Sequence, residues 1–149
     1  MKKIRYFLVF FIGILLCIYG FFNYMNNKEE EKIKDDIKNF CITNKRDLVI
    51  FASGKMSQED FKKKFTDINI KKDHKFPDII DFDFAGRGLG SASIYYGFYY
   101  IKNDDIEKTF NKIFEKREHD LWYFKEKNSD NSITIEKISP NWYYYKKTY

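Results

Sequence analysis

The feature that most constrains this chain is a stretch of nineteen residues, 6–24, that contains no charged side chain. As an α-helix it would be about 28 Å long, close to the thickness of the hydrocarbon core of a bilayer. A water-soluble helix of this length normally carries a polar stripe, but here only Asn23, near the end, is strongly polar. Tyr6 and Tyr24 flank the stretch, and tyrosine rings favour the headgroup region of a membrane. We therefore expect a transmembrane helix over residues 6–24, retained as a signal anchor.

Two other interpretations of this segment remain open. A cleaved signal peptide needs small residues after its apolar region, whereas this segment ends in Phe21, Phe22 and Asn23. Lipidation of Cys17, as in a bacterial lipoprotein, usually needs a small residue just before the cysteine, and Leu16 occupies that position. Both patterns fit less well than an uncleaved anchor, in which Cys17 is a small apolar membrane residue.

The charges around the segment predict its orientation. Lys2, Lys3 and Arg5 precede it, whereas the residues after it mix lysine with glutamate. Because positive residues flank the cytoplasmic end of a membrane helix, we expect residues 1–5 in the cytoplasm and residues 25–149 outside. Three of the five net positive charges lie in this flank, so the rest of the chain holds 24 basic and 22 acidic residues. Such a balanced outer domain is not expected to bind nucleic acid, which needs a basic surplus.

The first part of the outer domain has the spacing of helices. Over residues 28–53 the apolar positions recur as on one face of a helix. These positions are Ile33, Ile37, Cys41, Leu48 and Phe51. We expect this helix to continue from the membrane helix as a short stalk and to stop at Gly54. Ser57, with Asp60 three residues later, forms a weak capping box that begins a second, shorter helix.

The second half of the chain has the pattern of an antiparallel sheet. Alternating side chains and turn residues predict strands over residues 78–84, 93–102, 121–127, 132–138 and 142–148. Gly97, within a strand that is apolar on both faces, predicts a bulge or the close approach of another aromatic ring. Residues 104–118 have helical spacing, with a strand as the open alternative. We therefore predict an α+β fold with helices on one face of an antiparallel sheet of about five strands.

Two groups of residues are candidates for binding. Arg87 lies in a glycine-rich turn, residues 85–91, where it could contact an anion or a partner carboxylate. Aromatic residues cluster in two of the predicted strands, where they could stack on a sugar or a peptide, or simply pack in the core. The candidate binding residues are Arg87, Tyr95, Tyr99, Trp142 and Tyr144.

Candidate catalytic residues are few. Asp81 and Asp83 share one face of a strand and could act as acid and base, although a solvated strand face is a simpler interpretation. His119 could join them only through the fold. With Cys17 in the expected membrane helix, Cys41 and two histidines are too few ligands for a structural zinc site, and strands on both sides of the glycine turn argue against a dinucleotide site. We expect no cofactor and no metal, and we assign no catalytic residue.

Several short motifs resemble those of small exported or membrane-anchored proteins of low-GC Gram-positive bacteria. The segment from Phe84 to Ser91, followed by Tyr95 to Tyr100, carries the likeness. Residues 134–138 and 141–145 extend it, so the resemblance covers only the second half of the chain. The resemblance implies an extracytoplasmic domain and transfers no catalytic residues.

Three functions are compatible with these patterns. The leading expectation is a single-pass protein of the cell membrane whose outer domain binds a protein or cell-envelope component without catalysis. The first alternative is a cell-envelope hydrolase that uses Asp81 and Asp83, which requires these carboxylates to converge in a cleft. The second alternative is an immunity-type or inhibitor protein that binds one partner through the Arg87 turn.

Overall fold

The chain forms four helices and seven strands among the residues that the structure describes. This computed structural model describes residues 2–71, 76–88, 93–110, 114–117 and 120–149, with side chains from Phe11 onward. In chain order the elements are α1 (Lys2–Thr43), α2 (Lys45–Ala52), α3 (Gln58–Lys64), β1 (Asn69–Lys71), β2 (Ile79–Arg87), β3 (Ile94–Ile101), α4 (Ile106–Phe110), β4 (Glu115–Lys116), β5 (Leu121–Lys125), β6 (Ser132–Ser139) and β7 (Trp142–Thr148). They fall into two compact units, Met1–Ile33 and Lys34–Tyr149, and the second unit is the folded domain.

The apolar segment near the N-terminus is helical, as expected. It belongs to α1, which runs without a break from Lys2 to Thr43 and so includes the first part of the predicted stalk helix. The helix expected to continue to Gly54 is instead interrupted at Asn44, and its remainder is α2. Its transmembrane character is not confirmed. In the part of the chain with described side chains, which begins at Phe11, no helix is long and apolar enough to cross a membrane.

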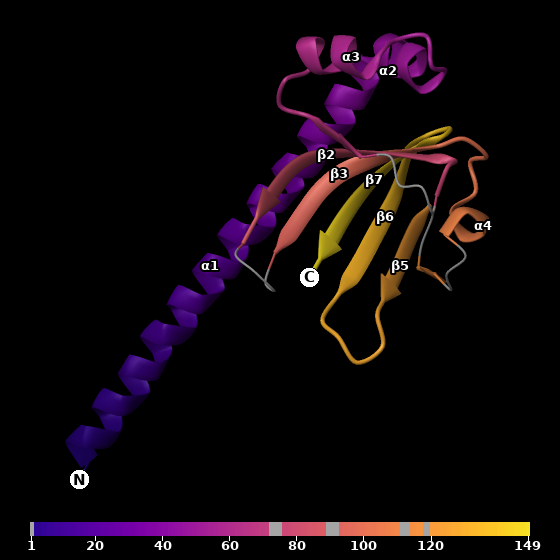
Figure 1. Ribbon diagram of the computed structural model, residues 1–149. Coiled ribbons are helices and arrows are strands. Elements are labelled where there is room, and N and C mark those ends of the chain that lie inside the picture. Colours follow the sequence, from indigo (N-terminus) through magenta and orange to yellow (C-terminus); the bar gives the residue numbers. More distant parts are fainter. Residues whose placement is uncertain (1, 72–75, 89–92, 111–113, 118–119) are drawn as a thin grey trace. The chain divides into compact units, whose positions relative to one another are not determined.

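The strands form one antiparallel sheet in the order β1-β2-β3-β7-β6-β5-β4 (Figure 1). All five predicted strands are present, and β3 is central as expected, between β2 and β7. The prediction of about five strands is wrong, since the sheet has seven. The two additional strands, β1 and β4, are only three and two residues long and lie at the sheet edges. Segments this short show no alternation that a sequence pattern could reveal.

One face of the sheet, which we call the helix face, is covered by the end of α1 together with α2 and α3. Phe82 of β2 and Phe98 of β3 stack at 4.5 Å between ring centroids on this face. Phe61 of α3 and Phe51 of α2 pack against Phe82, and Phe40 of α1 packs against Phe98. The Ser57 hydroxyl accepts a hydrogen bond from the Asp60 backbone, which confirms the predicted cap of α3.

Two ion pairs connect the sheet to the part of α1 that belongs to the folded domain, which begins at Lys34. Lys34 and Lys38, one helical turn apart, both contact the carboxylate of Glu136 in β6. Burial raises the pKa of Glu136, but the hydrogen bonds from the two lysines lower it more, so the net pKa lies below its usual value. Glu136 therefore stays ionised near neutral pH, and its contacts with both lysines fix the position of the helix along β6.

The opposite face, which we call the pocket face, carries a second core at one end. Ile106 and Phe110 of α4 pack there with Tyr99, Trp122 and Ile135. The expectation that helices cover one face only is therefore wrong. The sequence pattern missed this because the side chains of β3 are apolar on both faces, which leaves the position of a short helix undetermined.

The predicted helix over residues 104–118 is also shorter than expected. It begins after Asp105, whose carboxylate caps the backbone of Lys108, and β4 already starts at Glu115. Residues 111–113 and 118–119 lie outside the described residues.

Candidate functional site

The end of the pocket face that α4 leaves uncovered carries a group of polar and aromatic side chains. Successive residues of a strand point to opposite faces, so Asp81 and Asp83 of β2 lie on the same face. Tyr145 and Lys147 of β7 lie on this face too, because β3 pairs with both strands. Two strands that are distant in sequence, β2 and β7, thus supply one cluster.

Gly97 of β3 makes this cluster possible. A Cβ atom at this position would lie 2.5 Å from the Tyr145 hydroxyl and 2.6 Å from Cζ of the same ring, and it would also collide with the backbone oxygen of Phe82. Without a side chain at Gly97, the Tyr145 ring lies across β3 and reaches β2. The close approach of an aromatic ring predicted from Gly97 is confirmed.

The Tyr145 hydroxyl lies between the two carboxylates. Its oxygen is 2.7 Å from Oδ1 of Asp81 and 2.6 Å from Oδ1 of Asp83. One hydroxyl has one proton to donate, so two ionised carboxylates at these distances need nearby positive charge. Lys147 supplies it to Asp81 at 2.7 Å, and Lys71 of β1 pairs with Asp83.

The titration behaviour of the cluster follows from these contacts. Burial raises the pKa of Asp83, but hydrogen bonds from Lys71 and Tyr145 lower it more, so the net pKa is below its usual value. Burial is also the main cause of the raised pKa of Tyr145, and the charge of Asp81 adds to it. Near neutral pH, Asp83 is therefore a carboxylate and Tyr145 an intact phenol.

Two adjoining hollows open beside this cluster, and we call them together the tyrosine pocket. One has a volume of about 320 Å³ and the other of about 170 Å³. They share Lys71, Lys147 and Tyr149. The larger is also lined by Asp83, Ser93 and Tyr95, and the smaller by Asp81, Tyr99, Phe76, Ile79, Phe110 and Ile133.

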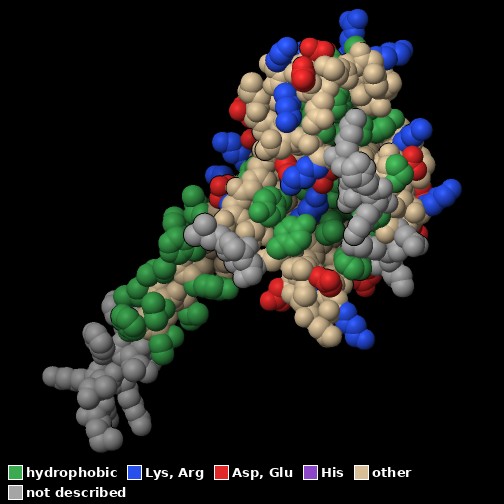
Figure 2. All heavy atoms as spheres, in the orientation of Figure 1, with side chains coloured by type: hydrophobic (Ala, Val, Ile, Leu, Met, Phe, Trp, Pro, Cys, Tyr) green, Lys and Arg blue, Asp and Glu red, His purple; other side chains and the backbone are tan. Residues whose placement is uncertain are grey.

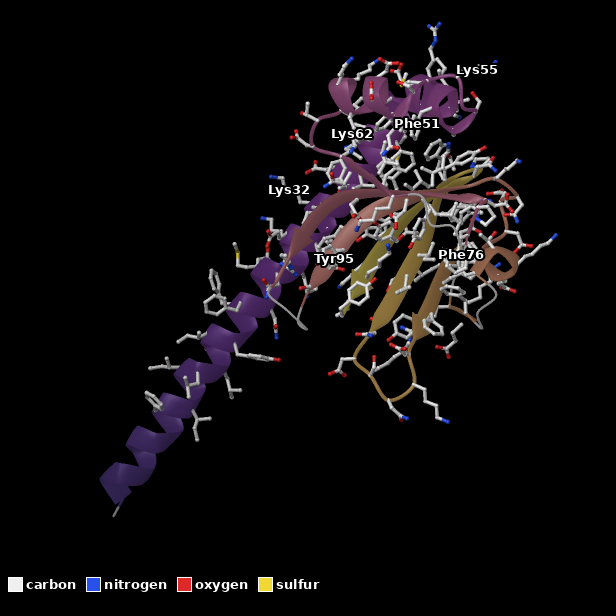
Figure 3. All side chains as sticks on the ribbon, in the orientation of Figure 1. Lys32, Phe51, Lys55, Lys62, Phe76 and Tyr95 are labelled. Carbon is white, nitrogen blue, oxygen red and sulfur yellow. The ribbon has the colours of Figure 1, made fainter. Side chains whose placement is uncertain are left out.

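The tyrosine pocket can be followed in two of the figures. Figure 2 shows basic side chains, in blue, beside green side chains of the class that includes tyrosine, on the side of the folded domain that faces the reader. In Figure 3, Tyr95 and Phe76 mark its polar and apolar ends. A larger hollow of about 670 Å³ is lined only by residues 125–130 of one turn, so no groups from separate elements converge there.

A second polar group, at the other end of the sheet, has a structural role. The Asp104 carboxylate accepts hydrogen bonds from the Tyr143 hydroxyl, Lys137 and the backbone of Asn141. Asp104 and Asn141 both have a positive φ, 54° and 70°, so this group ties two tight turns together.

The five predicted binding residues do not form one surface. Tyr95 and Tyr99 lie on the pocket face, where Tyr95 is 39% exposed and Tyr99 is buried. Trp142 and Tyr144 are buried, and their register opposite Tyr100 and Phe98 places them on the helix face. Arg87 is half-buried at the end of β2, and residues 89–92 of its turn lie outside the described residues.

The carboxylates proposed for catalysis do converge, as the hydrolase alternative requires. Asp81 and Asp83 meet at Tyr145 and line the tyrosine pocket, whereas His119 lies outside the described residues. Cys41 is buried, and burial raises its pKa to about 12, which makes its thiol a poor nucleophile. Within the described ranges, no group of three or more potential ligands is placed to hold a metal ion.

Sequence reasoning missed Lys71, Lys147, Tyr145 and Tyr149 as site residues. The available signal was a shared spacing: Asp81 and Asp83 are two residues apart, and so are Tyr145 and Lys147. Once β2, β3 and β7 are paired, both sets lie on one face and bring opposite charges together. The register of non-consecutive strands was the missing information.

Comparison with known proteins found no match: no family model, no curated protein and no solved structure is significantly similar to this chain. The function must therefore be inferred from the site itself.

We predict that Gly97→Ala destabilises the domain by about 1–3 kcal/mol or more, because the added methyl group overlaps Tyr145 and the strand backbone. Gly86→Ala is the matched control in the neighbouring strand. There the nearest atom is Cδ1 of Tyr95 at 3.1 Å, on a partly exposed ring that is free to shift. Denaturant unfolding followed by the fluorescence of Trp122 and Trp142 measures both variants. Equal stability of the two would contradict the role given to Gly97.

We predict that the stabilising effect of Asp83 disappears in acid. Its pKa is lower in the folded than in the unfolded state. Its contribution is therefore complete above the unfolded pKa of about 3.9 and is lost as the pH falls through the folded pKa. The difference in unfolding free energy between the wild type and Asp83→Asn should narrow below about pH 4. In a Lys71→Met background, which lacks the cationic partner of Asp83, the effect of Asp83→Asn on the unfolding free energy should be smaller already at neutral pH. A difference that stays constant from neutral pH into acid would refute this linkage.

Proposed function

We propose that this protein is a membrane-anchored binding domain that holds a cell-envelope component in the tyrosine pocket without catalysis. The observation that carries the proposal is the pocket itself, in which charged and aromatic groups from β1, β2, β3 and β7 converge at the uncovered end of a sheet face. Concave sites with a few convergent polar groups on an otherwise apolar wall are typical ligand sites.

The state of the carboxylates favours binding over hydrolysis. A hydrolase of the two-carboxylate type needs one carboxyl group with a raised pKa as the acid. Here Asp83 has a lowered pKa, and Asp81 is paired with Lys147, whose side chain is only 13% exposed. Both groups are therefore suited to accept hydrogen bonds. A cell-envelope hydrolase remains the second candidate because Asp81 and Asp83 share the pocket.

The proposed anchor is the apolar part of α1. From Phe11 to Met25 the large apolar side chains are 41–67% exposed. The uncharged stretch that contains them begins at Tyr6, after Lys2, Lys3 and Arg5. Moving such a helix from water into lipid lowers its free energy, because its apolar side chains leave water. The flanking charges favour an N-terminus in the cytoplasm with the folded domain outside.

Binding to the envelope tests the pocket. The full chain should co-sediment with isolated envelope material, and Tyr95→Ala should weaken this binding about tenfold, because it removes an exposed ring of the pocket wall. Tyr123→Ala is the matched control. Tyr123 lies opposite Thr134, away from the pocket, and its loss should leave binding within about twofold. Equal binding by the two variants would exclude the pocket, and release of soluble fragments from the envelope would favour the hydrolase.

Charge substitutions test the anchor. Ile14→Lys with Leu16→Lys should move the protein out of the membrane fraction, because each lysine costs about 2.5–3.5 kcal/mol in the middle of a membrane helix. The control pair, Val49→Lys with Ile42→Lys, lies in the folded domain. The exposures match: 41% and 65% for Ile14 and Leu16, and 47% and 67% for Val49 and Ile42. Membrane retention of both double variants, or a C-terminal domain protected from protease on intact cells, would contradict the anchored topology.

A further inference from the structure

The charges in the wall of the tyrosine pocket are balanced within the pocket itself. Two lysines and two aspartates line it, and they are already matched, Lys147 with Asp81 and Lys71 with Asp83. An ionic ligand would have to displace one of these contacts. A phosphate would face the carboxylates, and a cation would face the ammonium groups, so neither gains a net opposite charge. The balance favours an uncharged ligand.

The same groups keep hydrogen-bonding capacity for a neutral polar ligand. An ammonium group has three N–H donors, and a carboxylate has about four acceptor positions. Among the described residues, Lys147 donates to Asp81 alone, and Asp83 accepts from Tyr145 and Lys71. Donors and acceptors therefore lie side by side in the wall, because each lysine contacts its aspartate directly. A compound with several neighbouring hydroxyl groups, each able to donate and to accept, fits this arrangement.

The remaining wall is aromatic and partly exposed. Tyr95 and Tyr149 are 39% and 46% exposed, and their rings meet edge to face at 5.8 Å. Tyr99 continues the wall toward α4, and Phe76 and Phe110 line the adjoining hollow. Aromatic faces pack against apolar C–H surfaces and, in tyrosine, keep a polar tip. A ligand that offers hydroxyl groups at its edge and C–H groups on its face satisfies both kinds of wall.

We propose that the tyrosine pocket binds an uncharged sugar ring, a hexose or N-acetylhexosamine unit of an envelope glycan. The inference rests on the proposed function and adds the chemical class of the ligand. The hydroxyl groups of the sugar donate to Asp81 and Asp83 and accept from Lys71 and Lys147, and one face of the ring packs on Tyr95 and Tyr149. The ion pairs stay intact, so binding leaves no buried charge without a partner.

Calorimetric titration with defined oligosaccharides tests the ligand class. Chitotetraose represents N-acetylglucosamine chains, and cellotetraose and maltotetraose represent two linkages of glucose. Inorganic phosphate and glycine represent anionic and zwitterionic ligands. The full chain is held in lipid nanodiscs, because alkyl-glycoside detergents would themselves offer a sugar ring. We expect at least one oligosaccharide to bind with a Kd between about 1 μM and 1 mM, and phosphate and glycine not to bind.

Variants assign any binding to the pocket. Tyr95→Ala should raise the Kd about tenfold or more, and Tyr123→Ala should change it by less than about twofold. Tyr149→Ala is a second pocket variant, on an exposed side chain, should Tyr95→Ala lower the stability. The double variant Asp81→Asn with Lys147→Met removes a whole ion pair and should also abolish binding.

Three results would overturn the inference. Absence of binding by every oligosaccharide at about 10 mM would exclude a sugar; if Tyr95→Ala still weakened envelope binding, the proposed function would stand with another ligand. Binding that no pocket variant changes would place the sugar elsewhere. Tyr95-dependent binding of phosphate or glycine would show that the pocket selects charge. If the wild-type chain did not bind envelope material at all, that result would instead contradict the proposed function itself.

Discussion

The contact between Tyr145 and the bare backbone of Gly97 determines how the pocket face is built. Because the strand between β7 and β2 has no side chain at this point, a ring from β7 crosses it and places its hydroxyl between two carboxylates of β2. Lys147 and Lys71 neutralise these carboxylates, because two negative charges around one hydroxyl need positive partners when they are partly buried. The tyrosine pocket is the space left beside this arrangement.

The sheet serves two purposes because its faces are chemically different. The helix face is a stack of phenylalanine rings closed by the end of α1, α2 and α3, and it supplies the burial on which folding depends. The pocket face is apolar only where α4 covers it and polar where it does not. Since adjacent residues of β2 serve opposite faces, Phe82 in the core fixes the positions of Asp81 and Asp83 in the pocket. A rigid strand thus supports a polar site without a loop.

Local signals in the sequence were sufficient for most elements and insufficient for their assembly. The capping pair of Ser57 and Asp60, the apolar face through Ile37, Cys41 and Leu48, and the strands of the C-terminal meander are short-range patterns. Gly97 was a signal of intermediate range, because it predicted that a ring approaches but not which ring. The pairing of β3 with β7, about fifty residues apart, has no local signature. The site depends on this pairing, and so does the placement of Trp142 and Tyr144 on the opposite face from Tyr95 and Tyr99. The sequence therefore singled out the aromatic residues, but it could not show that they are divided between the two faces of the sheet.

The pocket network also implies how relatives of this chain can be recognised after overall similarity has faded. Six of its members come in pairs separated by one residue: Asp81 with Asp83, Gly97 with Tyr99, and Tyr145 with Lys147, whereas Lys71 of β1 stands alone. Each pair depends on the others, because a larger residue at Gly97 would overlap Tyr145, and the loss of Tyr145 would remove the hydroxyl that lies between the two carboxylates. A substitution at one of these positions is therefore expected to need a matching change at the others. The three short pairs on three strands can serve as a search pattern for chains that share this pocket.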